Sequence, residues 1–178
     1  MSAPSWLTAQ HIAHRGLHDA DKGIVENTPS AVAAAMAARY GIEVDLRLSA
    51  DGEAMVFHDP TLDRLTKAAG PVFHRRAAEL RKIPLRGTGD RMMDLRELTE
   101  QVKGRAPLIL DIKSDWDNVG PLERRVVQVL RAYRGPVAVM SFNPKSLRVF
   151  VEAAPALPRG IVAERFRNLD YWPNLSAW

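Results

Sequence analysis

The stretch Ile42-Glu-Val-Asp-Leu-Arg-Leu48 decides how the rest of the chain is interpreted. Its apolar residues are typical of a buried β-strand, yet Glu43 and Asp45 stand inside it. Because alternate residues of a strand point to the same face, both carboxylates lie on one side, with backbones about 7 Å apart. A second apolar run, residues 54–57, ends at His58. Strands with core composition therefore carry two carboxylates and an imidazole, and this combination needs a chemical explanation.

Six short apolar runs have the composition of strands, and helical patterns fall between most of them. Repeated strand–helix units predict an α/β fold with a parallel sheet, closed as a barrel or open and doubly wound. The connection 49–53 is shorter than the dozen or so residues that a parallel crossover needs. Either the strand ending at His58 is antiparallel to its predecessor, or the second barrel strand is short and the chain loops locally. The predicted strands are 11–14, 42–48, 54–58, 107–113, 137–142 and 159–164.

Helix starts are marked by capping signals between these runs. A Thr, Asp or Asn followed by Pro or by Glu three residues on is typical of a helix N-terminus. The predicted starts are Thr28-Pro29, Asp94 with Glu97, Gly120-Pro121 and Asn143-Pro144.

Composition limits the class of protein. The 178 residues, 46% of them hydrophobic, predict a single domain over 1–178 with a real core. The net charge of +4 suits an anionic substrate and does not indicate a nucleic-acid partner. No cysteine is present, which excludes disulfides and thiolate metal sites. The N-terminal residues lack a signal-peptide pattern and no apolar run reaches the roughly 20 residues of a membrane span, so we expect a cytoplasmic protein without stable membrane insertion.

Polar side chains gather at the C-terminal ends of the predicted strands, the end that forms the active site in α/β folds. Glu43 and Asp45 cannot both stay ionised when buried unless a cation offsets their repulsion. Asp111, from another strand, supplies a third oxygen ligand. Three carboxylates without cysteine indicate a hard divalent cation, Mg²⁺ or Ca²⁺. The alternative is a surface strand whose polar side chains face water.

Two histidines and two cations stand at the same predicted edge. His14 and His58 can divide the general acid and general base roles near neutral pH, although a histidine at a strand end can also be structural. Arg15 and Lys113 supply positive charge for a phosphate, or form ordinary salt bridges. The arginine-rich segment 75–91 is interpreted as a solvated helix and loop rather than a binding patch.

This ordered set of residues resembles the glycerophosphodiester phosphodiesterase family from about residue 11 to residue 165. No single piece of the set is specific, but their order and spacing together are. The matching motifs are His14-Arg15-Gly16, Glu26-Asn27-Thr28, Glu43-Val-Asp45, Asp51-Gly52, His58-Asp59, Leu62-Asp-Arg64-Leu-Thr66, Asp111-Ile-Lys113 and Ser141-Phe142.

The resemblance implies a TIM barrel that hydrolyses glycerol-linked phosphodiesters to glycerol 3-phosphate and an alcohol. In the family's usual reaction, the glycerol hydroxyl attacks phosphorus and water opens the resulting cyclic phosphate. The resemblance also implies roles for single residues. These are Glu43 and Asp45 as metal ligands, His14 and His58 as the acid/base pair, Arg15 and Lys113 as phosphate ligands, and Glu26 as a supporting residue near the metal or orienting a histidine.

Two features depart from the family pattern. The fourth-strand motif is usually Glu-x-Lys, and here it begins with Asp111. Aspartate is one methylene shorter, so a direct bond to the ion requires a shift of about 1 Å, or a water bridges the gap.

Residues 60–93 are similar to a short version of the insertion that follows the third strand in this family.

The second departure is length. A TIM barrel takes about 250 residues, and this chain supplies about six of the eight strands. We therefore expect a (β/α)8 barrel without its last strand–helix units, a fragment or truncated product with open sheet edges. The aromatic tail, with Tyr171, Trp172 and Trp178, either covers the opening or mediates self-association as a homo-oligomer.

The leading hypothesis is a metal-dependent phosphodiesterase whose partner is a small phosphodiester. A second hypothesis, motivated by the length, is a weakly active or inactive barrel that binds anionic ligands or a partner chain. A third keeps the enzyme and changes the substrate to a lysophospholipid, as in a lysophospholipase D, and an exposed apolar rim beside the site would favour it.

Overall fold

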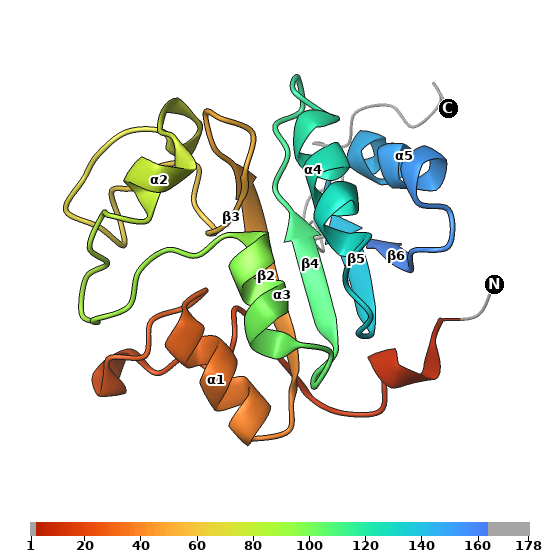
Figure 1. Ribbon diagram of the computed structural model, residues 1–178, viewed down its shortest axis with the longest axis horizontal. Coiled ribbons are helices and arrows are strands. Elements are labelled where there is room, and N and C mark those ends of the chain that lie inside the picture. Colours follow the sequence, from red (N-terminus) through yellow and green to blue (C-terminus); the bar gives the residue numbers. More distant parts are fainter. Residues whose placement is uncertain (1–2, 164–178) are drawn as a thin grey trace, which may run out of the picture.

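A computed structural model describes residues 3–163 of the chain as one six-stranded sheet with helices packed on it (Figure 1). The predicted residues Tyr171, Trp172 and Trp178 lie outside the described range. The strands are β1 (Ile12–Ala13), β2 (Gly41–Leu48), β3 (Ala54–Val56), β4 (Leu108–Ile112), β5 (Val137–Ser141) and β6 (Arg159–Ile161). The α-helices are α1 (Pro29–Ala37), α2 (Ala77–Leu80), α3 (Leu95–Val102), α4 (Pro121–Leu130) and α5 (Pro144–Ala153), and the 3₁₀ turns are η1 (Ser5–Leu7), η2 (Ala20–Lys22) and η3 (Val72–His74).

The strand order is β1-β2-β4-β5-β6, and all of these neighbours are parallel. β3 is antiparallel to β2, with Leu46 opposite Val56, so the first of the two alternatives for the short connection is confirmed. The hairpin closes tightly, because Ser49 donates its backbone N–H to the Glu53 carbonyl at 2.9 Å. The parallel order brings the C-terminal ends of β1, β2, β4 and β5 to one edge of the sheet.

The helix starts predicted from capping signals are confirmed for α1, α3, α4 and α5. At α3, Asp94 accepts the Glu97 N–H at 2.9 Å and Glu97 accepts the Asp94 N–H at 3.0 Å. This reciprocal pair satisfies two N–H groups that a helix start leaves without partners.

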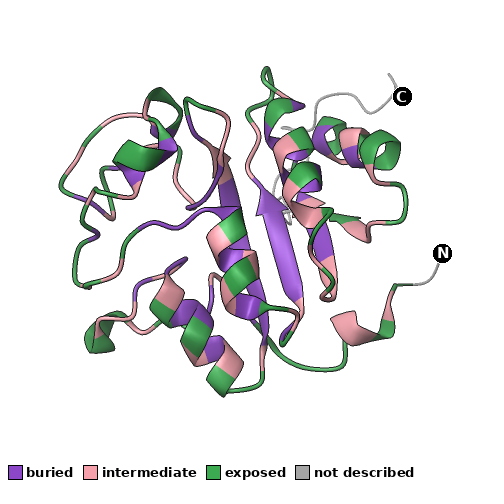
Figure 2. Cartoon of the chain, in the orientation of Figure 1, coloured by how far each residue is buried: buried purple, intermediate pink, exposed green. Residues whose placement is uncertain are grey.

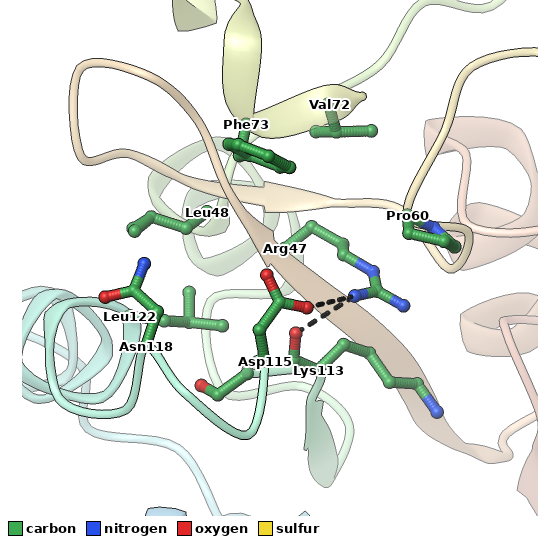
Figure 3. A pocket seen from close by; sticks show the side chains of 10 residues that line it. Arg47, Leu48, Pro60, Val72, Phe73, Lys113, Asp115, Asn118 and Leu122 are labelled. Carbon is green, nitrogen blue, oxygen red and sulfur yellow. Dashed lines mark hydrogen bonds and ion pairs between the residues drawn. The ribbon is translucent and has the colours of Figure 1, made fainter. Parts of the chain in front are cut away.

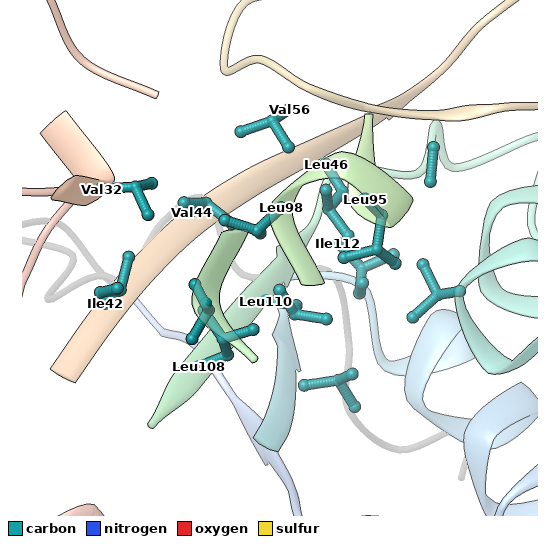
Figure 4. Packing of buried hydrophobic residues seen from close by; sticks show 14 of the residues in the cluster. Val32, Ile42, Val44, Leu46, Val56, Leu95, Leu98, Leu108, Leu110 and Ile112 are labelled. Carbon is teal, nitrogen blue, oxygen red and sulfur yellow. The ribbon is translucent and has the colours of Figure 1, made fainter. Parts of the chain in front are cut away.

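The main core lies between one face of the sheet and the helices that cover it (Figures 2 and 4). Ile42, Val44 and Leu46 of β2 are fully buried and pack with Leu95 and Leu98 of α3. Since strand side chains alternate, the residues between them on β2 project to the opposite face of the sheet. That opposite face carries Glu43 and Asp45, so burying the core fixes which way the carboxylates point.

A second, smaller core folds the insertion between β3 and α3. Its buried residues come from the end of the hairpin, from η3 and from α2, and they form a cluster separate from the main core. Two arginines of the arginine-rich segment pair with acidic residues at the start of α3: Arg81 with Asp94 and Glu97, and Arg91 with Glu97. The members of this second core are Met55, Phe57, Leu62, Val72, Ala77, Leu80, Leu85 and Met92. Within residues 3–163, no helix has the length and apolar character needed to cross a membrane.

Gly16 gives a test of the packing at the end of β1. Its φ of +76° lies in the left-handed region, and an added Cβ would lie 2.8 Å from the Ala31 carbonyl carbon. We expect Gly16→Ala to lower the free energy of unfolding by about 3 kcal/mol, from the backbone penalty and the clash together. Gly52 is the matched control, because its φ is +83° with nothing within 4 Å. Gly52→Ala should cost only about 1 kcal/mol in urea unfolding, and equal costs for the two variants would contradict the predicted clash.

Candidate active site

The predicted site residues meet at the C-terminal edge of the parallel strands. His14 directly follows β1, and Asp45 of β2 is the register partner of Asp111 of β4. His58 follows β3 after one residue, and Lys113 follows β4 at once. Segments far apart in the sequence therefore bring their polar side chains to one place.

Three carboxylates form the centre of this site. Ligand oxygens of Glu43, Asp45 and Asp111 lie within 4.8 Å of one another, and each side chain is at least 95% buried. Each carboxylate has one buried oxygen without a hydrogen bond: Glu43 Oε1, Asp45 Oδ1 and Asp111 Oδ1. Two Ca²⁺–oxygen bonds of about 2.4 Å span at most about 4.8 Å, so one oxygen from each of the three carboxylates lies close enough to the others to share a hard divalent cation. The shorter side chain of Asp111 still reaches the cluster.

Burial of these carboxylates raises the pKa values of two of them, Glu43 and Asp111. Loss of hydration, with repulsion from Asp45, raises the pKa of Glu43 to about 8. Burial also raises the pKa of Asp111, while its contact with Lys113 opposes the rise. Without an ion the cluster therefore holds a proton near neutral pH, and a bound cation would replace it.

Two cationic side chains flank the carboxylates. Lys113 Nζ lies 2.6 Å from Asp111 Oδ2 and 3.2 Å from Asp45 Oδ1, and 5.2 Å from the centre of the Phe142 ring. Arg15 Nε lies 3.3 Å from Asp45 Oδ2, and Arg15 also donates to Glu26 Oε1 at 2.9 Å. Two cations beside three carboxylates leave one negative charge when all three carboxylates are ionised.

Two residues keep left-handed backbone conformations at the site. Arg15 and Asn27 both have φ of 59°, which is uncommon outside glycine. The Arg15 backbone N–H donates to Glu43 Oε2 at 2.8 Å. The Asn27 amide donates to Asp45 Oδ2 at 2.9 Å, and its oxygen accepts the Asp45 N–H at 3.2 Å. These contacts with buried carboxylates maintain the strained conformations.

The two predicted histidines have different environments. His14 Nε2 lies 3.9 Å from Glu43 Oε2, its side chain is 69% exposed, and partial burial together with Arg15 lowers its pKa. His58 is more enclosed, and its Nδ1 lies 2.7 Å from Asp59 Oδ1. Because an ionised carboxylate only accepts, Nδ1 is the donor in this contact, and in the neutral imidazole Nε2 is then the acceptor. Hydrogen bonds from Arg64 lower the pKa of Asp59 to about 2, so Asp59 stays ionised.

Arg47 is a site residue that the sequence interpretation missed. Its Nε donates to the His58 carbonyl at 2.8 Å. One terminal nitrogen donates to the Lys113 carbonyl at 3.2 Å (Figure 3). The same nitrogen lies 3.7 Å from Asp115. A signal was present, since Arg47 follows Glu43 and Asp45 at the same two-residue spacing on β2. Asn27 and Arg64 were also missed, although both stand in the motifs quoted above.

Arg47 also lines a pocket of about 70 Å³ (Figure 3). Leu48, Val72, Phe73 and Leu122 give it an apolar lining beside the Lys113 backbone. Its small volume fits a few heavy atoms rather than a whole substrate.

Comparison with known proteins gives one consistent family. The model of the glycerophosphoryl diester phosphodiesterase family matches residues 14–177. The chain is 32% identical over 161 residues to a glycerophosphodiester phosphodiesterase of Caldanaerobacter subterraneus subsp. tengcongensis, covering 85% of this chain and 65% of the relative. The chain thus spans slightly less than two thirds of that relative's length.

Solved structures agree with this similarity. A glycerophosphodiester phosphodiesterase from Agrobacterium tumefaciens is 29% identical with a TM-score of 0.73, over 84% of this chain and 65% of that chain. A phosphodiesterase from Oleispira antarctica, in complex with the product sn-glycerol-3-phosphate, is 26% identical with a TM-score of 0.78. The match covers 89% of this chain and 66% of that chain. The predicted fold class is confirmed: the six strands are part of a phosphodiesterase-type TIM barrel.

The raised pKa of Glu43 predicts how the stability of the metal-free protein depends on pH. Between its unfolded value of 4.5 and its folded value of about 8, the folded state keeps a proton that the unfolded chain has lost. The contribution of Glu43 to stability therefore falls as pH rises through this window. We expect Glu43→Gln to raise the free energy of unfolding at pH 8 by about 2 kcal/mol, with little change at pH 4.5.

Urea unfolding in the presence of a chelator measures this effect. Glu152→Gln is the control, because the Glu152 side chain is 71% exposed and, among residues 3–163, its ion pair is with Arg148 at 3.6 Å. Its stability should follow the wild-type pH dependence. A Glu43→Gln protein that gains no stability at pH 8 would contradict the raised pKa.

Proposed function

The chain belongs to the glycerophosphoryl diester phosphodiesterase family, and on this basis we propose that it hydrolyses glycerophosphodiesters with the help of a divalent cation, Mg²⁺ or Ca²⁺. The products are glycerol 3-phosphate and an alcohol. The observation that carries the proposal is the set of three buried carboxylate oxygens without hydrogen bonds, flanked by two cations and two histidines. The product bound to the Oleispira antarctica phosphodiesterase supports the proposed substrate class.

Glu43, Asp45 and Asp111 are the proposed ligands of the cation. A divalent ion bound there supplies a Lewis acid that polarises a phosphoryl oxygen. The buried, water-poor surroundings strengthen this effect, since charges interact more strongly away from bulk water. Asn27 and the Arg15 backbone each donate to one carboxylate and so orient the ligand oxygens.

Arg15 and Lys113 are the proposed ligands of the non-bridging phosphate oxygens. The Arg15 guanidinium is suited to this role because its planar donors match phosphate geometry. Glu26 accepts from Arg15 and holds the guanidinium in place. Lys113 adds a second positive charge from the end of β4, and its carbonyl accepts a hydrogen bond from Arg47.

His14 and His58 are proposed to divide the proton transfers. Nε2 of His58 is free to accept the proton of the attacking glycerol hydroxyl, and Asp59 stabilises the imidazolium that forms. His14, as the acid, then gives its proton to the leaving alcohol oxygen. In the second step the roles reverse as water opens the cyclic phosphate.

The exposed aromatic residues at the site edge favour a second candidate substrate, a lysophospholipid. Phe73 and Phe142 are 50% and 40% exposed. Phe73 lines the pocket beside Lys113, and Phe142 lies against the Lys113 ammonium group. An apolar rim of this kind suits an acyl chain. Turnover of lysophosphatidylcholine faster than glycerophosphocholine would support this substrate.

The histidine roles predict a loss of activity without a loss of metal binding. We expect His14→Ala and His58→Ala each to lower kcat on glycerophosphocholine by about 10²- to 10⁴-fold, because each removes one proton transfer. Calcium affinity, measured by calorimetry, should change little. His11→Ala is the control, since His11 precedes β1 at the opposite end of the strand. Turnover that survives both site substitutions would overturn the assigned chemistry.

The carboxylate cluster predicts the source of metal affinity. We expect Asp111→Asn to weaken calcium binding at least about 10-fold, because it removes the charge of one proposed ligand. Asp117→Asn is the control, since Asp117 is exposed and lies outside the carboxylate cluster. Calorimetric titration with Ca²⁺ and Mg²⁺ separates the enzyme from an anion-binding barrel: metal binding without turnover would favour the latter. Equal affinities for wild type and Asp111→Asn would remove Asp111 from the ligand set.

A further inference from the structure

Arg64 makes an unusual number of hydrogen bonds for a half-exposed arginine. Its guanidinium donates to Asp59 Oδ2 at 2.6 Å and Asp59 Oδ1 at 3.0 Å. It also donates to Glu26 Oε2 at 3.0 Å and Glu26 Oε1 at 2.7 Å. Each carboxylate is thus bound through both of its oxygens. Paired contacts of this kind fix the carboxylates' orientation as well as their charge.

The two carboxylates each contact a proposed functional residue. Asp59 Oδ1 also lies 2.7 Å from His58 Nδ1, and Glu26 Oε1 also accepts from Arg15 at 2.9 Å. A continuous path of hydrogen bonds therefore runs His58–Asp59–Arg64–Glu26–Arg15. Arg64 is the central member, and it contacts neither His58 nor Arg15 directly.

The second core holds the backbone around Arg64. Leu62 and Thr66, on either side of it, are fully buried. The Thr66 hydroxyl donates to the Leu62 carbonyl at 2.9 Å, and the Thr66 N–H donates to the same carbonyl at 3.0 Å. These bonds close a turn that presents Arg64 from a rigid segment. The apolar packing of the insertion thus fixes where the guanidinium lies.

We propose that Arg64 is a positioning residue that orients His58 through Asp59 and Arg15 through Glu26. This inference rests on the proposed function. With Arg64 in place, Asp59 has one orientation and holds the Nδ1 proton of His58, so that Nε2 stays directed to the reacting groups. Without it, the carboxylate rotates freely and the imidazole samples both tautomers. A purely structural Arg64 would stabilise the loop and leave the imidazole unchanged.

The first experiment compares kcat and KM of Arg64→Ala and Arg64→Lys. We expect Arg64→Ala to lower kcat on glycerophosphocholine about 10- to 100-fold, as removal of an orienting partner generally does. KM should change less, because Arg15 keeps its contact with Asp45. Arg64→Lys restores the charge and lacks the planar fork, so it should recover only part of kcat. Wild-type kcat in Arg64→Ala would overturn the proposal.

Arg91→Ala is the matched control. Arg91 belongs to the same insertion, its side chain is 54% exposed, and it pairs with a glutamate, Glu97, outside the hydrogen-bonded path. Its kcat should stay within about twofold of wild type, the size expected for an exposed ion pair. An equal loss of kcat in Arg91→Ala and Arg64→Ala would indicate general destabilisation of the insertion and overturn the proposal.

A double substitution tests the route through Asp59. If Arg64 acts on His58 through that carboxylate, Arg64→Ala combined with Asp59→Asn lowers kcat little further than Asp59→Asn alone. The small remaining effect belongs to the Glu26 branch. If the fold-loss of kcat in the double variant equals the product of the two single losses, Arg64 acts independently of Asp59, and the proposed path is overturned.

Imidazole ¹⁵N NMR gives a readout that does not depend on turnover. At one pH, the wild-type His58 signals should show a single Nδ1–H tautomer, and Arg64→Ala should show averaged nitrogens. Unchanged His58 signals in a folded Arg64→Ala protein would overturn the positioning role. A wild-type protein that hydrolyses no phosphodiester would overturn the proposed function, while the NMR result would still decide whether Arg64 positions His58.

Discussion

The burial of three carboxylates at one edge of the sheet is the constraint on which the rest of the site depends. Glu43, Asp45 and Asp111 lie too close together to remain ionised without compensation. Arg15 and Lys113 supply part of the opposing charge, and the proposed divalent ion would offset the remainder. The strained backbone, the flanking cations and the raised pKa of Glu43 all follow from this arrangement.

The β2 strand serves the core and the site at once. Ile42, Val44 and Leu46 bury one face against the helices, so the alternate side chains must project to the other face. Those side chains include Glu43, Asp45 and, farther along, Arg47. A one-residue slip in strand register would turn the carboxylates toward the apolar core. The main core therefore fixes the register of β2. The packing that stabilises the fold thus also sets the direction of the polar side chains at the site.

The insertion between β3 and α3 adds a second layer of support. The insertion carries Asp59 and Arg64, and Arg64 donates to Glu26, which in turn accepts from Arg15. Arg47 links the backbones after β3 and β4, because it donates hydrogen bonds to the His58 and Lys113 carbonyls. The positions of the proposed acid/base and phosphate-binding side chains thus depend on contacts outside the carboxylate cluster.

The sequence by itself determined the local structure of this protein. Short apolar runs identified the strands, two-residue alternation identified the shared face of Glu43 and Asp45, and capping residues identified the helix starts, because these signals act between near neighbours. Only the tertiary structure decided which other distant groups meet: Arg47 on the Lys113 carbonyl 66 residues away, and Arg64 on Glu26 at a separation of 38. Such contacts depend on strand order and on how the insertion packs, and no local pattern encodes either of them.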